Sequence, residues 1–144
     1  WKPLRLKRRW MPSLWIAGLV MLALLLAFPK YFYPFVWLSL FFLIDPIQAY
    51  LGRESLLARV SGGNWKSVLT LSVGCLICGF FWEMWNVFSY PKWTYRIPFF
   101  DFLRVFEMPL LGYLGYIPFS WELFAIYQLV TGRKADGNLF GKAP

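Results

Sequence analysis

Long apolar stretches, separated by prolines, glycines and short charged segments, constrain the fold of this chain more than any other feature. Of its 144 residues, 59% are hydrophobic, 22% are aromatic and only 15% are charged. Because soluble domains carry about 25% charged residues, this balance predicts a membrane protein formed by one domain over 1–144. Only helices and closed barrels satisfy their backbone hydrogen bonds in lipid. We therefore expect an all-α integral membrane protein with about four transmembrane helices.

The apolar stretches predict where the chain crosses the bilayer. The first one, "SLWIAGLVMLALLLAF", is followed by no A-x-A cleavage site, so we expect an uncleaved span. Extended by flanking residues, it approaches the ~20 residues that cross a bilayer. We expect four spans at about 13–28, 34–50, 67–90 and 106–131, between a basic arm at 1–12 and a polar tail at 132–144.

Prolines and glycines predict irregularities in two of the spans. The pair Asp45-Pro46 predicts a kink in the second span. Prolines and glycines also interrupt residues 106–118, which are therefore expected to form a broken helix or a re-entrant stretch. A regular helix is expected from Pro118, because proline suits the first turn of a helix. Between the spans, "ESLLARV" predicts a short helix on the membrane surface, and 91–107 a segment at the headgroup level.

The positive charges predict the orientation of the chain. Lys and Arg mark the cytoplasmic side of a membrane protein, and 11 of the 15 fall on one side of the predicted spans. We therefore expect a multi-pass protein of the cell (inner) membrane with both termini cytoplasmic. The inner residues are Lys2, Arg5, Lys7, Arg8, Arg9, Arg53, Arg59, Lys66, Arg133, Lys134 and Lys142, and the outer residues are Lys30, Lys92, Arg96 and Arg104.

A glutamate inside the third span is the strongest candidate for a functional residue. A charge at the centre of a membrane helix costs ~2.5–3.5 kcal/mol, so such residues usually face the protein interior and have partners. In "GFFWEMWN", Glu83 shares one helical face with Asn86 and Gly79, and a small residue there lets another helix approach. The nearest predicted cations are Arg96 and Arg104. The sequence leaves three kinds of partner open for Glu83: an arginine, a tyrosine hydroxyl, or a second carboxyl group such as that of Glu122.

The other acids and the tryptophans complete the candidate site. Glu83 and Glu122 are the candidate catalytic residues. The alternative is structural: a Glu83 whose hydrogen bonds are all satisfied would fix the packing of the helices. An aromatic-lined cavity for a lipid, quinone or isoprenoid is expected around Trp82, Trp85, Phe106 and Trp121. The candidate binding network comprises Glu83, Asn86, Arg96, Arg104, Glu107, Glu122, Trp82, Trp85 and Trp121.

Several kinds of chemistry are excluded or disfavoured by composition. Histidine is absent, which excludes His-based catalysis and the common zinc sites, and no metal site is expected. Cys75 and Cys78 form a CxxC in an apolar run, where we expect small packing residues rather than a redox pair. The net charge of +8 gathers at the ends of apolar stretches, so we expect anionic lipids and not nucleic acid as its partner.

Two functions from different classes remain open from the sequence. The first is a small non-catalytic accessory subunit of a larger membrane complex, or a homo-oligomer, which stabilises assembly and contacts bound lipid, quinone or carotenoid. The second is a membrane-embedded enzyme that acts on a lipid or isoprenoid through its intramembrane glutamates. A transporter is disfavoured because no internal repeat is evident.

Overall fold

The computed structural model describes residues 8–96 and 102–134. Over these residues the fold is all-α, as the sequence predicts, apart from one short two-stranded antiparallel ladder. The predicted basic arm as far as residue 7 and the polar tail from residue 135 lie outside the described residues, as do residues 97–101 of the predicted headgroup segment.

The described chain contains four long helices, two short helices, two 3₁₀ helices and two strands. They are η1 (Arg8–Trp10), α1 (Met11–Ala27), α2 (Pro29–Phe32), α3 (Phe35–Tyr50), α4 (Leu56–Ser61), α5 (Lys66–Val87), β1 (Arg104–Val105), β2 (Met108–Pro109), η2 (Leu110–Gly115) and α6 (Tyr116–Thr131).

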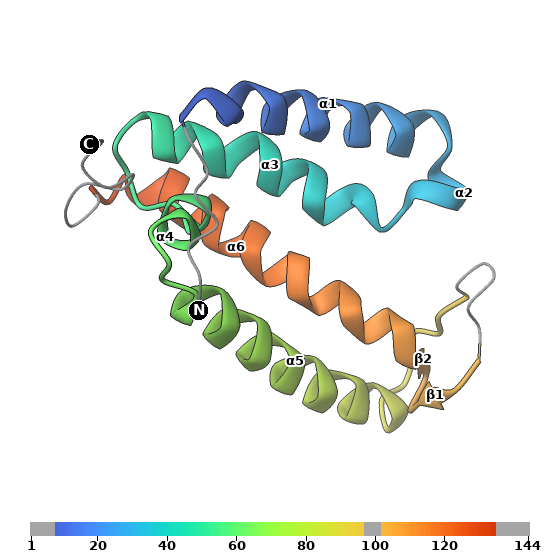
Figure 1. The fold of residues 1–144 in the computed structure, drawn as a ribbon. Helices are drawn as coiled ribbons and strands as arrows, with labels where there is room; N and C mark the ends of the chain where they lie inside the picture. The colour runs from blue at the N-terminus through green and yellow to red at the C-terminus, as the bar shows by residue number, and fades with distance from the viewer. Residues whose placement is uncertain (1–7, 97–101, 135–144) are drawn as a thin grey trace.

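The four long helices lie side by side in the order α1, α3, α6, α5 (Figure 1). Each packs on its neighbour in that row, which leaves α1 and α5 at the two edges. The chain runs from left to right in Figure 1 along α1 and α5, and from right to left along α3 and α6. One end of the row therefore carries α4 and the end of α6, and the other carries α2 and the β1–β2 ladder.

Helices α1 and α3 approach closely at a glycine. A Cβ built on Gly18 would lie 3.1 Å from the backbone oxygen of Ser39, so only a very small residue allows this packing. Nearby, the indole nitrogen of Trp15 donates to the carbonyl of Leu43 at 2.8 Å. This bond lies one turn before Pro46, the proline inside α3, where helix carbonyls need partners from neighbouring helices.

The acid of the predicted kink organises the loop that follows α3. Asp45 is fully buried, and its Oδ2 accepts from the Ser55 hydroxyl at 2.6 Å and from the backbone N–H of Leu57 at 3.0 Å. Its Oδ1 accepts from the N–H of Leu56 at 2.9 Å. Ser55 itself caps α4 by accepting from Ala58. Asp45 therefore satisfies orphan N–H groups at the start of α4 from within another helix.

The short helix of the first loop is more buried than its sequence predicts. We expected it to lie on the membrane surface, but Leu56, Ala58 and Val60 are all buried. Leu56 packs in one cluster with Phe41 and with Ala125 of α6. The apolar face of this helix therefore packs on α3 and α6, and its position at the membrane surface stays a prediction.

The broken half of the fourth segment forms a hairpin and a 3₁₀ helix. Strands β1 and β2 pair Arg104 with Pro109 and Val105 with Met108, and η2 then leads directly into α6. The regular helix begins at Tyr116, two residues before Pro118. It ends at Gly132, whose φ of 61° is the left-handed conformation that favours glycine.

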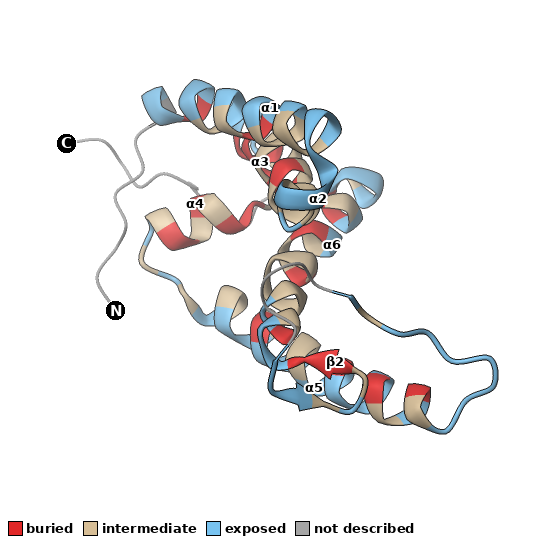
Figure 2. Ribbon diagram, turned by 90° about the vertical axis from the view of Figure 1, so that its right-hand side faces the viewer, coloured by how far each residue is buried: buried red, intermediate tan, exposed pale blue. Residues whose placement is uncertain are grey.

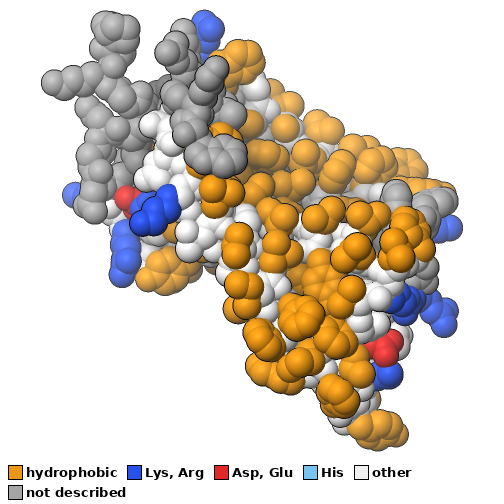
Figure 3. All heavy atoms as spheres, turned by 60° about the horizontal axis from the view of Figure 1, so that its bottom comes forward, with side chains coloured by type: hydrophobic (Ala, Val, Ile, Leu, Met, Phe, Trp, Pro, Cys, Tyr) orange, Lys and Arg blue, Asp and Glu red, His pale blue; other side chains and the backbone are white. Residues whose placement is uncertain are grey.

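The distribution of polar and apolar side chains is inverted relative to a water-soluble bundle. Among the described residues, ten polar or charged ones are buried, against nine hydrophobic ones, while 30 large hydrophobic residues are exposed. Buried residues lie in short patches along the helices and in strand β2 (Figure 2). On the face drawn in Figure 3, hydrophobic side chains cover the middle, and the Lys, Arg and acidic side chains lie toward the two ends.

Among the described helices, α5 alone is both long and apolar enough to cross a bilayer, with 22 residues. The apolar helices α1 and α3 are shorter, with 17 and 16 residues.

Candidate functional site

Glu83 lies inside the protein and is held by two tyrosines. Its side chain on α5 is 0% exposed, and its Oε1 accepts from the hydroxyl of Tyr95 at 2.6 Å and from that of Tyr116 at 3.0 Å. Tyr116 is the first residue of α6, and Tyr95 comes from the extended segment after α5. Among the described residues Oε2 has no hydrogen-bond partner although it is buried. Glu83 thus joins three separate parts of the chain and keeps one acceptor unused.

The Tyr95 hydroxyl is fixed as a donor in this arrangement. Burial first, and then the hydrogen bond to Glu83 and its negative charge, raise the pKa of Tyr95. The hydroxyl therefore keeps its proton, which it donates to Glu83.

A glycine one turn before Glu83 makes room for the second tyrosine. A Cβ on Gly79 would lie 2.5 Å from a ring carbon of Tyr116. Only glycine therefore lets the Tyr116 ring lie against α5 with its hydroxyl within reach of Glu83. The face that carries the acid is also the contact face of the helix, as the sequence predicts.

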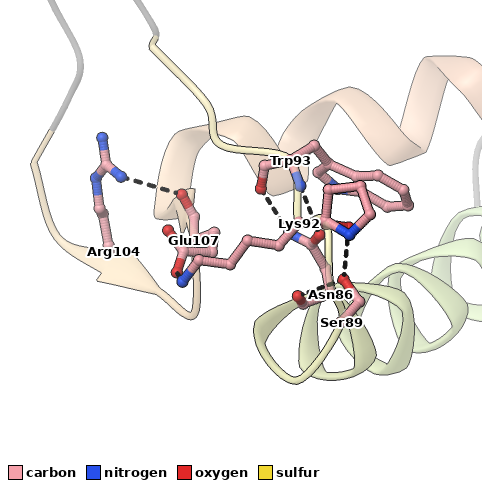
Figure 4. Close-up of polar contacts among 7 residues, drawn as sticks. Asn86, Ser89, Lys92, Trp93, Arg104 and Glu107 are labelled. Atoms are coloured by element: carbon pink, nitrogen blue, oxygen red, sulfur yellow. Dashed lines mark hydrogen bonds and ion pairs between the residues drawn. The ribbon is translucent and has the colours of Figure 1, made fainter.

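Asn86 positions the segment that carries Tyr95. Its Nδ2 donates to the carbonyl of Trp93 at 2.8 Å, and its Oδ1 accepts from the N–H of Trp93 at 3.0 Å (Figure 4). The Trp93 ring stacks on Trp82, with ring centroids 5.3 Å apart. Asn86 thus replaces a backbone partner for residue 93 and holds the chain that leads to Tyr95 against the end of α5.

We expect Asn86→Asp to lower the free energy of unfolding by about 1–3 kcal/mol, the cost of an unsatisfied buried group. The substitution keeps the acceptor but sets a carboxylate oxygen against the Trp93 carbonyl. Unfolding in mixed micelles followed by circular dichroism measures the change. The matched control is Asn64→Asp, because Asn64 only accepts, from the N–H of Lys66 at an exposed position. Equal effects of the two substitutions would contradict the role given to Asn86.

The cations near the β1–β2 hairpin bind groups other than the Glu83 carboxylate. Lys92 forms an ion pair with Glu107. Arg104 donates to the backbone carbonyls of Glu107 at 3.3 Å and of Tyr95 at 3.1 Å. The ion pair of Lys92 with Glu107 and the bond of Arg104 to Tyr95 tie the β1–β2 hairpin to the segment after α5. Figure 4 shows Lys92, Arg104 and Glu107. The predicted Arg–carboxylate pair at Glu83 is therefore wrong, and the tyrosine alternative is the one observed. From the sequence, Arg96 and Arg104 are expected to be the cations closest to Glu83 in depth within the bilayer. In the structure, Arg104 donates to backbone carbonyls instead.

An apolar cavity lies in front of the Glu83 cluster. It has a volume of about 520 Å³ and is lined by residues of α3, α5, η2 and α6. Five aromatic residues form much of its wall, and the free thiols of Cys75 and Cys78 and three glycines contribute to the rest. The aromatic residues are Trp37, Trp82, Tyr95, Tyr116 and Phe119, and the glycines are Gly79, Gly112 and Gly115. Because both tyrosines that bind Glu83 belong to the wall, the carboxyl group lies directly behind it.

The structure brings together only part of the predicted network. Trp82 lines the cavity, as predicted. Trp85, by contrast, is 63% exposed, and Trp121 packs on Phe41 and donates to the Ser72 hydroxyl at 3.0 Å. Of the four aromatic residues predicted around the cavity, Trp82 lines it, whereas Trp85, Phe106 and Trp121 are not among its lining residues.

The remaining candidates are separated from Glu83. Glu107 pairs with Lys92 rather than with the Glu83 cluster. Glu122 is buried on α6 at 7% exposure, and the described contacts of Glu83 do not include it. Arg96 is exposed.

The structure adds four residues that were not candidate site residues from the sequence: Tyr95, Tyr116, Trp37 and Asp45. The only sequence signal for them was the acid before Pro46, since tyrosines near span ends resemble ordinary interface residues.

Among the described residues, no group of three or more His, Cys, Asp or Glu side chains could hold a metal ion. Comparison of the chain with protein-family models, with curated proteins and with solved structures found no match.

Proposed function

We propose that this chain is an integral membrane protein with four crossings and cytoplasmic termini that binds the apolar chain of a lipid-like molecule between α5 and α6. Lipid, quinone, carotenoid and other isoprenoids belong to this class of ligand. The observation that carries the proposal is the aromatic cavity of about 520 Å³, a size within the range of ligand pockets, in a protein whose outward faces are apolar.

The inverted surface supports the membrane part of the proposal. In lipid, apolar side chains face outward and scarce polar groups face the protein interior, which matches the distribution of buried and exposed residues here. The helix lengths are compatible with it: 16 residues span about 24 Å and 22 residues about 33 Å, against a hydrocarbon core of about 30 Å. The short helices reach across with the help of η1, α2 and η2.

The positions of the charges support the orientation. The backbones of Arg53 and Lys134 pair as an isolated antiparallel β-bridge, and the N–H of Glu54 donates to the carbonyl of Arg133 at 3.2 Å. The first loop and the end of α6 therefore share one end of the molecule, the end assigned to the cytoplasm. The hairpin with Arg104 lies at the other end (Figure 1).

The open row of helices supports a role as a non-catalytic subunit. Helices α1 and α5 are the edges of the row, and large apolar residues on both are exposed, among them Ile16 and Leu26 on α1 and Ile77 on α5. Such faces are available to lipid and to other membrane subunits. An enzyme acting on the same ligand is the second candidate. It is favoured by one observation: the Oε2 of Glu83 is buried behind the cavity wall and has no hydrogen-bond partner among the described residues.

The two native thiols provide a direct test of binding. We expect geranylgeraniol, a neutral isoprenoid alcohol, to protect Cys75 and Cys78 from alkylation by maleimide, because both thiols line the cavity. At a probe concentration about ten times the Kd, mass action lowers the alkylation rate about tenfold. The rate is measured by mass spectrometry on the full chain in lipid nanodiscs.

The matched control is an Ile77→Cys variant. Ile77 lies on the same helix and is 54% exposed, but it does not line the cavity. Its thiol is expected to react at the same rate with and without the probe. Equal slowing at position 77, or no protection of the native thiols, would overturn the proposal.

A further inference from the structure

We propose that the cavity selects ligands with a cationic nitrogen head on an apolar body, an amine or a quaternary ammonium. This inference rests on the proposed function and names the class of ligand for that site. It starts from Glu83, whose side chain is fully buried and which no Lys or Arg of the described ranges 8–96 and 102–134 pairs with.

The hydrogen bonds around Glu83 leave acceptors, and not donors, at this wall of the cavity. A tyrosine hydroxyl has one proton to donate and two lone pairs. Tyr95 and Tyr116 both donate that proton to Oε1 of Glu83, so each hydroxyl can act toward a ligand only as an acceptor. Oε2 keeps its own acceptor capacity without a partner among the described residues. The polar groups at this wall therefore suit a positive charge and repel an anion.

The aromatic lining adds to the same preference. The faces of tryptophan, tyrosine and phenylalanine rings attract cations within about 6 Å, most strongly when the ion is desolvated. Trp37 and Phe119 meet edge to face, with centroids 6.3 Å apart, and Trp82 and Tyr116 belong to the same lining. None of the described lining residues is Lys or Arg, and Arg104 donates to the backbone carbonyl of Tyr95.

Charge completes the argument for the occupant. A buried carboxyl group without a counter-charge is costly, and a partner of opposite charge offsets that cost. The protein places aromatic faces and acceptors between Glu83 and the cavity, where a diffuse organic cation makes use of all of them. A compact inorganic cation lacks the oxygen ligands that it requires there, and the apolar wall favours a long hydrocarbon body.

The experiment compares hexadecyltrimethylammonium with its neutral isostere, in which carbon replaces nitrogen, and with hexadecyl sulfonate. Each is added to the full chain in nanodiscs below the concentration that disrupts them, and protection of Cys75 and Cys78 from maleimide is measured. We expect the cation to bind at least about tenfold more tightly than the neutral isostere, and the anion more weakly than both.

Two variants test whether the charge of Glu83 causes the preference for the cation. Glu83→Gln keeps the shape and an acceptor oxygen for the tyrosines but removes the charge, and is expected to lose most of the preference for the cation, with only the contribution of the aromatic faces left. Glu122→Gln, a buried acid of α6 outside the cavity lining, is expected to keep the preference.

The outcomes separate the two proposals. Equal protection by the cation and the neutral isostere in the wild type, or an unchanged preference in Glu83→Gln, overturns the inference and leaves the binding of apolar chains intact. Protection by none of the probes overturns both. Stronger protection by the sulfonate would assign an anionic ligand and overturn the inference.

Discussion

Replacing Asp45 with alanine is expected to lower the free energy of unfolding by about 3 kcal/mol or more, because each buried donor left without a partner costs about 1–3 kcal/mol. Three donors lose their acceptor at once: the hydroxyl of Ser55 and the backbone N–H groups of Leu56 and Leu57. The side chain that accepts all three bonds is 0% exposed. Titration with sodium dodecyl sulfate in maltoside micelles, followed by circular dichroism, measures the change.

Two milder variants grade the effect of Asp45. Asp45→Asn keeps one acceptor oxygen and is expected to fall between wild type and alanine. Ser55→Ala removes the cap of α4 and one donor, and is expected to cost about 1–2 kcal/mol. If Asp45→Ala costs no more than Ser55→Ala, the carboxyl group is not the organiser of this loop.

The second large effect is expected at Gly79. Gly79→Ala places a methyl group where the structure leaves 2.5 Å to the ring of Tyr116, a distance that forces the ring away. We expect the free energy of unfolding to fall by about 1–3 kcal/mol from overpacking. A further loss is expected from the bond between Tyr116 and Glu83. The same titration measures it, and the protection of Cys75 and Cys78 by an apolar ligand is expected to weaken, since Gly79 and Tyr116 both line the cavity.

Gly74 provides the matched control on the same helix. A Cβ at Gly74 would meet no atom within 4 Å, so Gly74→Ala is expected to be neutral or to stabilise α5 through the higher helix propensity of alanine. Opposite signs for the two glycine variants are expected. Destabilisation of equal size at both positions would mean that loss of glycine in itself, not contact with Tyr116, determines the effect.

The helices of this protein could be predicted because apolar runs and their breaks are local signals. The predicted spans at 13–28 and 34–50 correspond to α1 (Met11–Ala27) and α3 (Phe35–Tyr50). The break before α6 was also predicted from its prolines and glycines, although its hairpin and 3₁₀ helix were not. Hydropathy and proline act on the chain where they stand, so no tertiary contact is needed to recognise them.

The burial of Glu83 was predicted for a related reason. A charge within an apolar run is too costly to face lipid, and a glycine on the same helical face indicates where another helix approaches. Its partners were not predictable in the same way. Tyr95 and Tyr116 lie 12 and 33 residues away along the chain, and tyrosines near the ends of apolar runs are common for other reasons.

Sequence alone determined that this chain is helical, where its helices begin and end to within a few residues, and that Glu83 and Asn86 face the interior. The tertiary structure alone decided that tyrosines and not arginines hold Glu83, that Asp45 organises the first loop, and which aromatic residues line one cavity. The reason is that helix formation and burial follow from the local spacing of side chains. Hydrogen-bond partners and cavity walls instead depend on which distant segments the packing of α3, α5 and α6 brings within a few ångströms.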